Sequence, residues 1–265
     1  MAVGLSGLIV AVSFFTAWQG DWRFWMVLLV AIAVLVVFAI AQLHMKHPLI
    51  EVRTFAYPGF SLGMLILVMS SGGVLGLNFL LPILLQRGFG QSGMIAALVL
   101  LPGAVVGAVS APLIGGALKN HFPPKFIICG FIGVSVMDVV LMLGGRHELV
   151  VAVAYALFMA ASGFVLVPDL THALNQLPAR MNADGSAVMN TIQQLAGAIG
   201  TAVASALITE SSAAGMLRGL DEAEAYLTGF ASSMGVLLGV GCVGIVLAAF
   251  MFRFSTRRPP ELVDV

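Results

Sequence analysis

The stretch Gly185-Ser-Ala-Val-Met-Asn-Thr-Ile-Gln-Gln-Leu-Ala-Gly-Ala-Ile-Gly-Thr-Ala202 decides the fold. As a helix it rises about 1.5 Å per residue and covers most of the hydrocarbon thickness of a bilayer. An amide side chain in lipid needs a hydrogen-bond partner, because its unpaired desolvation costs several kcal/mol. Helical spacing nevertheless places polar and small residues on one stripe: Asn190, Gln194, Gly197, Thr201 and Ser205. This stripe can face other helices or a wet cavity but hardly lipid, so the helix belongs to the interior of a polytopic membrane protein.

The composition supports a membrane protein. The 265 residues are 60% apolar and 9% charged, with a net charge of zero. Soluble domains carry roughly 25% charged residues, so a soluble fold is excluded. The charge balance gives no reason to expect nucleic acid as a partner. Cys129 and Cys242 lie in apolar runs and are interpreted as small core residues.

Eight apolar stretches predict an all-α fold with about eight transmembrane helices, over residues 2–17, 22–43, 59–85, 92–118, 125–144, 148–175, 186–210 and 229–252. All but the first reach the ~20 residues that span a bilayer. They divide the chain into two N-terminal helices (1–45), a cytoplasmic linker (46–58), a six-helix bundle (59–252) and a cytoplasmic tail (253–265). The acidic segment from Ser211 to Thr228 is predicted to be a solvated cap on the membrane surface.

Lysine and arginine set the predicted orientation, because cytoplasmic loops carry an excess of both. One set of loops and the tail hold Lys46, Arg53, Lys119, Lys125, Arg180, Arg253, Arg257 and Arg258. The alternate loops hold Arg23, Arg87, Arg146 and Arg218. The first set is the larger, so we expect a multi-pass protein of a prokaryotic inner membrane with both termini in the cytoplasm.

Prolines and glycines indicate how the helices pack. Proline usually kinks a membrane helix, and the candidates for kinks or gating are Pro82, Pro102, Pro112 and Pro168. Small residues four apart let helix backbones approach closely. Such pairs occur at Gly59/Gly63, Gly72/Gly76, Gly103/Gly107 and Gly235/Gly239. They predict generic close packing of helices.

Further patterns follow one another in a characteristic order: His47-Pro-Leu-Ile-Glu-Val-Arg-Thr-Phe55, Phe79-Leu-Leu-Pro-Ile-Leu-Leu-Gln86, Leu100-Leu-Pro-Gly-Ala104, Val167-Pro168, and Asn175-Gln-Leu-Pro178. With the stretch from Gly185 to Ala202, they resemble the fourteen-helix drug:proton antiporter branch of the major facilitator superfamily. The resemblance implies the C-terminal bundle of such a transporter, preceded by its two extra central helices. The family's first six helices would have no counterpart here.

One loop departs from the family pattern. Where the family tends to have an acidic residue after Gly-x-x-x, this sequence reads Gly115-Gly-Ala-Leu-Lys119. In the family, a loop of this type makes charge contacts that hold the inward gate. Lys119 therefore puts conventional gating in doubt.

Three titratable residues within the apolar stretches are candidates for proton coupling. Asp138 is an acid well inside a helix, where a carboxylate is costly unless it is paired. It is either a protonatable site facing the substrate cavity or a hydrogen-bonded acid that reaches interfacial water. Asp169 and His172 are three residues apart on one helix face. They either relay protons or form an ion pair near the cytoplasmic end.

Five amides are candidates for lining a substrate cavity: Asn78, Gln86, Asn190, Gln193 and Gln194. Each could contact an amphipathic compound. Alternatively, Asn78 and Gln86 bond to kinked backbone near Pro82, and the other three tie helices together. The sequence has no phosphate-binding glycine loop, Ser/His/Asp set or zinc-ligand spacing, so we expect no enzyme, cofactor or metal site.

Two functions remain open. One is proton-coupled efflux of small amphipathic drugs by rocking of two helical bundles, which requires a second transporter half or a second copy of this chain. The other is an inactive truncated fragment or a non-transporting membrane scaffold.

Overall fold

The computed structural model describes residues 52–117 and 123–257, together with residues 26, 29 and 30. This part of the chain is helical with short turns and contains no strand. Six helices in these described ranges are long and apolar enough to cross a membrane: α3 (Pro58–Ile83), α4 (Gly93–Ala117), α5 (Pro123–Gly144), α6 (Glu148–Leu174), α7 (Asn182–Leu217) and α8 (Glu222–Arg257). The prediction of an all-α polytopic fold is confirmed. The two helices predicted before residue 46 fall almost wholly outside the described residues, and Lys119 does so entirely.

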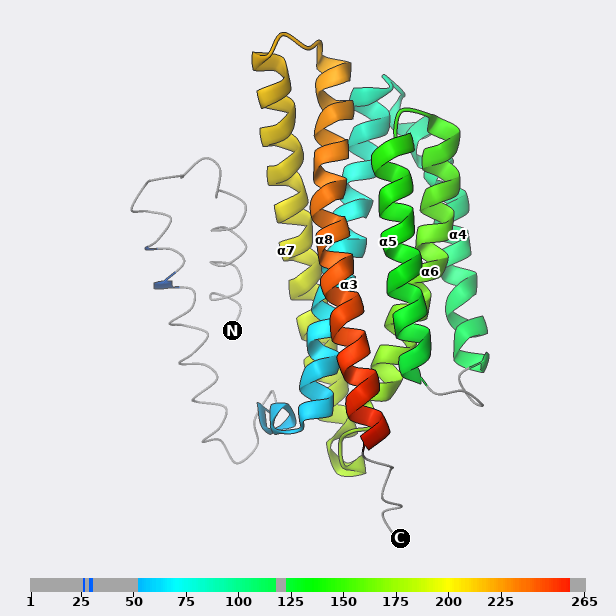
Figure 1. Ribbon diagram of the computed structural model, residues 1–265, viewed down its shortest axis with the longest axis vertical. Coiled ribbons are helices and arrows are strands. Elements are labelled where there is room, and N and C mark those ends of the chain that lie inside the picture. The colour runs from blue at the N-terminus through cyan, green and yellow to red at the C-terminus, as the bar shows by residue number, and fades with distance from the viewer. Residues whose placement is uncertain (1–25, 27–28, 31–51, 118–122, 258–265) are drawn as a thin grey trace.

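The six helices run up and down side by side, with α7 and α4 at opposite edges (Figure 1). Helix α6 packs against both α5 and α4, and α3 packs against α7 and, less extensively, α6 and α8. Helix α4 rests on α6 and hardly touches the other helices. The centre of the bundle is therefore formed by α3, α5, α6 and α8.

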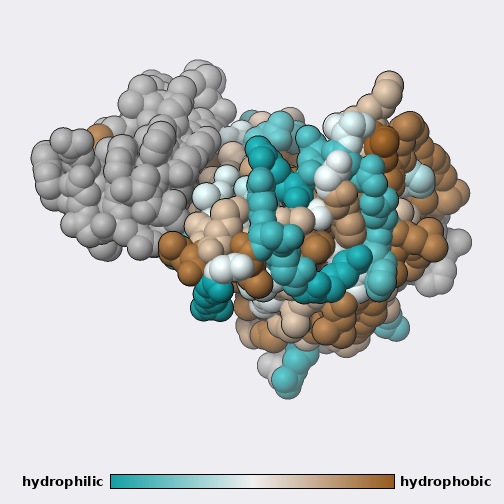
Figure 2. Space-filling model, turned by 90° about the horizontal axis from the view of Figure 1, so that it is seen from above, coloured by the Kyte–Doolittle hydropathy of each residue, from teal (hydrophilic) through white to brown (hydrophobic). Residues whose placement is uncertain are grey.

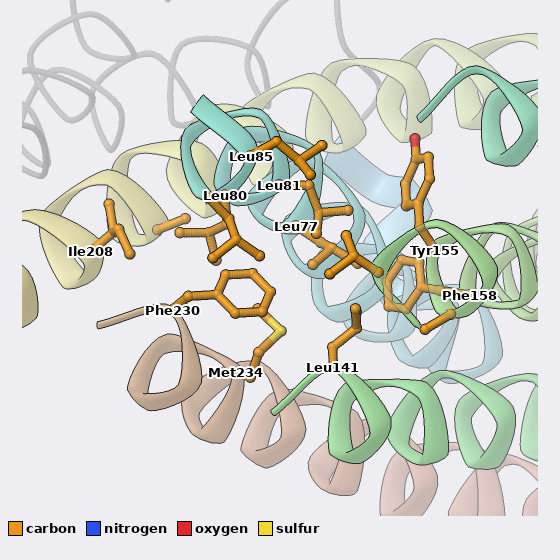
Figure 3. Packing of buried hydrophobic residues seen from close by; sticks show 14 of the residues in the cluster. Leu77, Leu80, Leu81, Leu85, Leu141, Tyr155, Phe158, Ile208, Phe230 and Met234 are labelled. Carbon is orange, nitrogen blue, oxygen red and sulfur yellow. The ribbon is translucent and has the colours of Figure 1, made fainter. Parts of the chain in front are cut away.

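The main hydrophobic core surrounds the second half of α3. Leucines at helical spacing are fully buried along α3 and the π-helical turn that continues it from Leu84 to Gly88, at positions Leu77, Leu80, Leu81, Leu84 and Leu85. Figure 3 shows aromatic and apolar side chains from α5, α6, α7 and α8 converging on them, among them Phe158 and Phe230. Because residues three or four apart share one helix face, this leucine run holds α3 at the centre of the bundle.

Glycines let α3 and α7 cross at backbone contact. A Cβ at Gly200 of α7 would overlap the backbone of Gly72, and one at Gly76 would lie 3.2 Å from the Gly200 carbonyl oxygen. On α4, Gly103 and Gly107 instead make room for the side chains of Tyr155 and Met159 of α6. Close packing is thus found at these pairs, and also at Gly59 and Gly63, which meet Gln176 and Ala173. In contrast, Gly235 and Gly239 of α8 face open space.

The prediction of a cap lying on the surface between Ser211 and Thr228 is wrong as to its conformation, whereas its solvation stays a prediction. Helix α7 continues to Leu217, a tight turn follows, and α8 begins at Glu222. Gly219 makes the turn with a φ of +87°, and the Leu220 amide donates to the Gly215 carbonyl at 3.2 Å. A polar sequence favours leaving the membrane, but it does not end a helix whose backbone bonds are satisfied within the segment.

The interpretation of the cysteines as core residues is also wrong. Cys129 on α5 and Cys242 on α8 are free thiols at exposed positions. In a membrane helix, an apolar surrounding sequence does not distinguish a lipid-facing position from a buried one, since lipid tails are as apolar as a protein core.

The proline positions lie within helical segments. Pro82 lies inside α3, which passes directly into a π-helical turn, η2 (Leu84–Gly88). Pro102 and Pro112 lie inside α4, and Pro168 lies inside α6. Each helix therefore continues past its proline.

Ion pairs connect the turns at one end of the bundle. Figure 2 looks down on this end and shows hydrophilic residues gathered in its middle, with hydrophobic residues around them. Arg87 donates to Glu222 at 2.9 Å, and Arg146, between α5 and α6, forms a bidentate pair with Glu224. The hydrogen bond and the charge of Glu224 raise the pKa of Arg146. These pairs join the first turn of α8 to the α3–α4 and α5–α6 connections.

Replacing Glu224 with glutamine is expected to lower the free energy of unfolding by at most about 1 kcal/mol, because both partners are exposed and an exposed ion pair contributes little. The effect should shrink at high salt, which screens surface charges. Thermal unfolding of the purified protein at low and high salt measures it. Glu210→Gln, at an exposed acid of α7, serves as the control; an equal loss in that variant would contradict a specific role for the Arg146 pair.

Candidate functional site

Asp138 lies in the interior of the bundle. The residues that precede and follow it at helical spacing on α5, Phe131 and Leu141, are buried, so the same face carries the carboxyl group inward. The Asp138 side chain is 1% exposed, and its Oδ1 has no hydrogen-bond partner among the described residues. The acid therefore lies among α3, α5, α6 and α8, deep inside the helical bundle.

Asp169 and His172 are both buried on α6, as their shared face requires. The Asp169 carboxylate packs near Gly63 of α3, where a side chain would crowd its Oδ1. Neither carboxylate oxygen has a hydrogen-bond partner within the described part of the chain, so Asp169 and His172 are not hydrogen-bonded to each other. Both side chains are enclosed by protein, and a role in moving protons remains a prediction.

Asn78 joins α3 to α6. The Tyr155 hydroxyl donates to Asn78 Oδ1 at 2.7 Å. Figure 3 shows that this hydroxyl points away from the leucine cluster while the ring packs against it. The contact links the two helices and holds the amide of Asn78 at the edge of the core.

Gln86 bonds to backbone beside Pro82. Its Nε2 donates to the Pro82 carbonyl at 3.2 Å, one turn earlier, and the side chain is exposed. This is the structural alternative considered from the sequence. The bond is local to the last turn of α3 and the start of η2, so it ties the Gln86 side chain to its own helical segment.

Replacing Tyr155 with phenylalanine is expected to lower the free energy of unfolding by about 1 kcal/mol, because the bond to Asn78 is lost and the ring packing is kept. Thermal unfolding of the purified protein in detergent measures the loss. Tyr226→Phe is the control, since the Tyr226 ring also packs against the core but no described residue bonds to its hydroxyl. Equal melting temperatures in the two variants would contradict the prediction.

The amide stripe of α7 divides into two parts. Asn190 and Gln194 are exposed, and Gln193 is half-buried, so the described helices leave this part largely uncovered. One turn later, Gly197 is buried against Leu75 of α3. The end of the helix nearer the α6–α7 turn thus presents amides outward, whereas its middle packs on α3.

An apolar cavity of about 170 Å³ lies between α3, α7 and α8. Its lining is almost wholly aliphatic and includes Gly73, Gly200, Val236 and Leu237. The sequence analysis missed this cavity. The glycines of α3 and α7 could have indicated the cavity, because glycines on two facing helices leave empty space between the helices as well as allowing their backbones to touch.

Among the described residues, no group of three or more His, Cys, Asp or Glu side chains comes together. Within this part of the chain, the buried acids stand apart on different helices. The chemistry available at the site is therefore that of single carboxyl groups, amides and hydroxyls.

The sequence profile of the Major Facilitator Superfamily matches residues 1–201. The lincomycin resistance protein LmrB of Listeria monocytogenes is 33% identical over 260 residues, which cover 94% of this chain and 55% of that protein. LmrB of Bacillus subtilis is 31% identical over 265 residues, with 95% and 55% covered. The multidrug efflux pump LfrA of Mycolicibacterium smegmatis is 29% identical over 165 residues, with 61% and 32% covered.

This chain belongs to the Major Facilitator Superfamily, since the profile matches well over half of its length. It is a multi-pass membrane protein, and the relatives named here come from bacteria. The chain spans about half the length of the LmrB relatives it matches.

Proposed function

We propose that this chain forms the C-terminal bundle of a fourteen-helix transporter that exports amphipathic drugs in exchange for protons. The observation that carries the proposal is the outward-facing amide pair Asn190 and Gln194 on a membrane-spanning helix. Amides are too costly to leave in lipid, so they favour a second helical bundle or an aqueous pathway on that side. Relatives named for lincomycin resistance and multidrug efflux support the substrate class.

In this proposal the bundle works with a second half, either another polypeptide segment or a second copy of the chain. Asn78, Gln193 and the outward amides of α7 would contact the substrate, and both termini would lie in the cytoplasm. Asp138, Asp169 and His172 are the candidates for exchanging protons. The buried position of each is consistent with a group that takes up or releases a proton only when the bundle opens.

Drug flux in vesicles tests the proposal. Proteoliposomes containing this chain, alone or with the six N-terminal helices of LmrB, are loaded with lincomycin and given a proton gradient. We expect gradient-dependent flux when both halves are present. Absence of flux in both preparations, with the protein folded and inserted, would favour the alternative of a non-transporting membrane scaffold.

A further inference from the structure

A second, smaller cavity lies at the centre of α3, α5, α6 and α8. Its volume is about 20 Å³, close to what one water molecule requires. Three polar side chains line it, Ser70, Asp138 and Ser162, and the rest of the lining is apolar or glycine. The cavity is far too small for a drug-sized compound, which fills a pocket of several hundred Å³.

The Asp138 carboxyl group lacks a neutralising partner. Its Oδ1 is buried without a hydrogen-bond partner among the described residues, and no basic side chain lines the cavity. Asp138 is also the one titratable group in the lining contributed by the four helices. A carboxylate taken out of water without a counter-charge costs several kcal/mol. A charged Asp138 therefore requires a cation beside it.

The hydroxyl groups around the cavity present oxygen lone pairs. Ser70 donates its proton to the Leu67 carbonyl at 3.2 Å, and Ser162 donates to the Met159 carbonyl at 2.8 Å. Because each proton is used, each oxygen can accept from, or coordinate, a group in the cavity. Carboxylate and hydroxyl oxygens are ligands that suit hard cations.

Helix α8 approaches this cavity closely because residue 241 is glycine. A Cβ there would lie 2.5 Å from the Oγ of Ser135 and 3.8 Å from Oδ2 of Asp138. The Ser135 hydroxyl, one turn before Asp138 on α5, is itself buried without a partner among the described residues. A further oxygen is thus available on the α8 side of the acid.

We propose that this cavity is a binding site for one Na⁺ ion, held by the Asp138 carboxylate and the hydroxyl oxygens of Ser70 and Ser162. A single positive charge neutralises the single carboxylate, whereas a divalent ion would leave excess charge in apolar surroundings. Binding to the protonated acid exchanges one ion for another: the carboxylic acid loses its proton to solvent, and the carboxylate formed coordinates Na⁺. The site does not require the chain to transport.

Equilibrium binding of radioactive sodium to the purified full chain in lipid nanodiscs tests the site, with choline chloride keeping the ionic strength constant. At alkaline pH we expect saturable binding of one ion per chain, weakening as the pH falls. At a pH low enough for the acid to be protonated before binding, an indicator dye should report one proton released for each ion bound. Asp138→Asn is expected to abolish the saturable binding.

A matched pair of serine variants gives a second test of sodium binding, which does not depend on the folding of the Asp138 variant. Ser70 and Ser71 are neighbouring buried residues of α3, but only Ser70 lines this cavity. Ser70→Ala is expected to weaken sodium binding about tenfold, as the loss of one polar contact would. Ser71→Ala should leave it unchanged.

Three outcomes would overturn the proposal. The first is the absence of saturable sodium binding to the wild-type chain at alkaline pH, as expected of a cavity that holds a neutral acid and water. The second is equal affinity in the Ser70→Ala and Ser71→Ala variants. The third is potassium binding at least as tightly as sodium, which the size of the cavity does not favour.

Discussion

Replacing Gly200 with alanine is expected to destabilise the bundle by about 2–3 kcal/mol, in the range of overpacked core substitutions. The new methyl group would overlap the Gly72 backbone of α3. Backbone atoms cannot rotate away as a flexible side chain can, so α3 and α7 would have to separate. Thermal unfolding of the purified protein in bicelles measures the loss.

Gly239→Ala is the matched control for this prediction. A Cβ at Gly239 of α8 meets no atom within 4 Å, so it has no steric cost. Alanine is the better helix former by up to about 1 kcal/mol, and the variant should be as stable as the parent or slightly more so. Equal destabilisation by both substitutions would show that α3 and α7 do not depend on backbone contact at this crossing.

If the chain works as the proposed drug:proton exporter, replacing Asp138 with asparagine is expected to abolish drug-driven proton movement while expression stays unchanged. Asparagine has nearly the same shape but cannot exchange a proton, and the other residues lining the small cavity offer no titratable group in its place. A pH-sensitive dye inside proteoliposomes measures the proton movement on addition of drug.

Asp184→Asn provides the control for the coupling measurement. Asp184 is an exposed acid in the first turn of α7, so its loss removes the same charge without touching the interior. Coupling should survive in this variant. If drug-driven proton movement is also unchanged in the Asp138→Asn variant, the prediction is wrong and Asp138 has only a structural role.

The membrane-spanning helices could be predicted from the sequence because their signal is local. A continuous apolar run of sufficient length predicts a span, and the runs beginning near residues 59, 92, 125 and 148 correspond to α3, α4, α5 and α6 within a few residues. The end of α7 could not be found in this way. From Ser211 to Leu217 the helix continues beyond the apolar stretch and is held by its own backbone hydrogen bonds. Hydropathy gives no information on such bonds.

The surroundings of the site residues could be predicted less well. The presence of Asp138 inside a helix is visible in the sequence, but the serines of α3 and α6 that share its cavity come from segments distant in the chain. The alternative for Gln86 was correctly considered, because its partner Pro82 is only four residues away. The partner of Asn78, by contrast, is Tyr155, 77 residues further on.

The isolated position of α4 bears on how the chain enters the membrane. Helix α4 meets α6 along Gly103 and Gly107 and has almost no contact with α3, although α3 precedes it in the chain. A ribosome makes the N-terminal helices first, so α4 reaches the bilayer before its partner exists. Its 25 residues contain no charged side chain, and most of its surface is apolar. Helix α4 can therefore remain in lipid as a stable single span until α6 is made, two helices later. It then packs against α6.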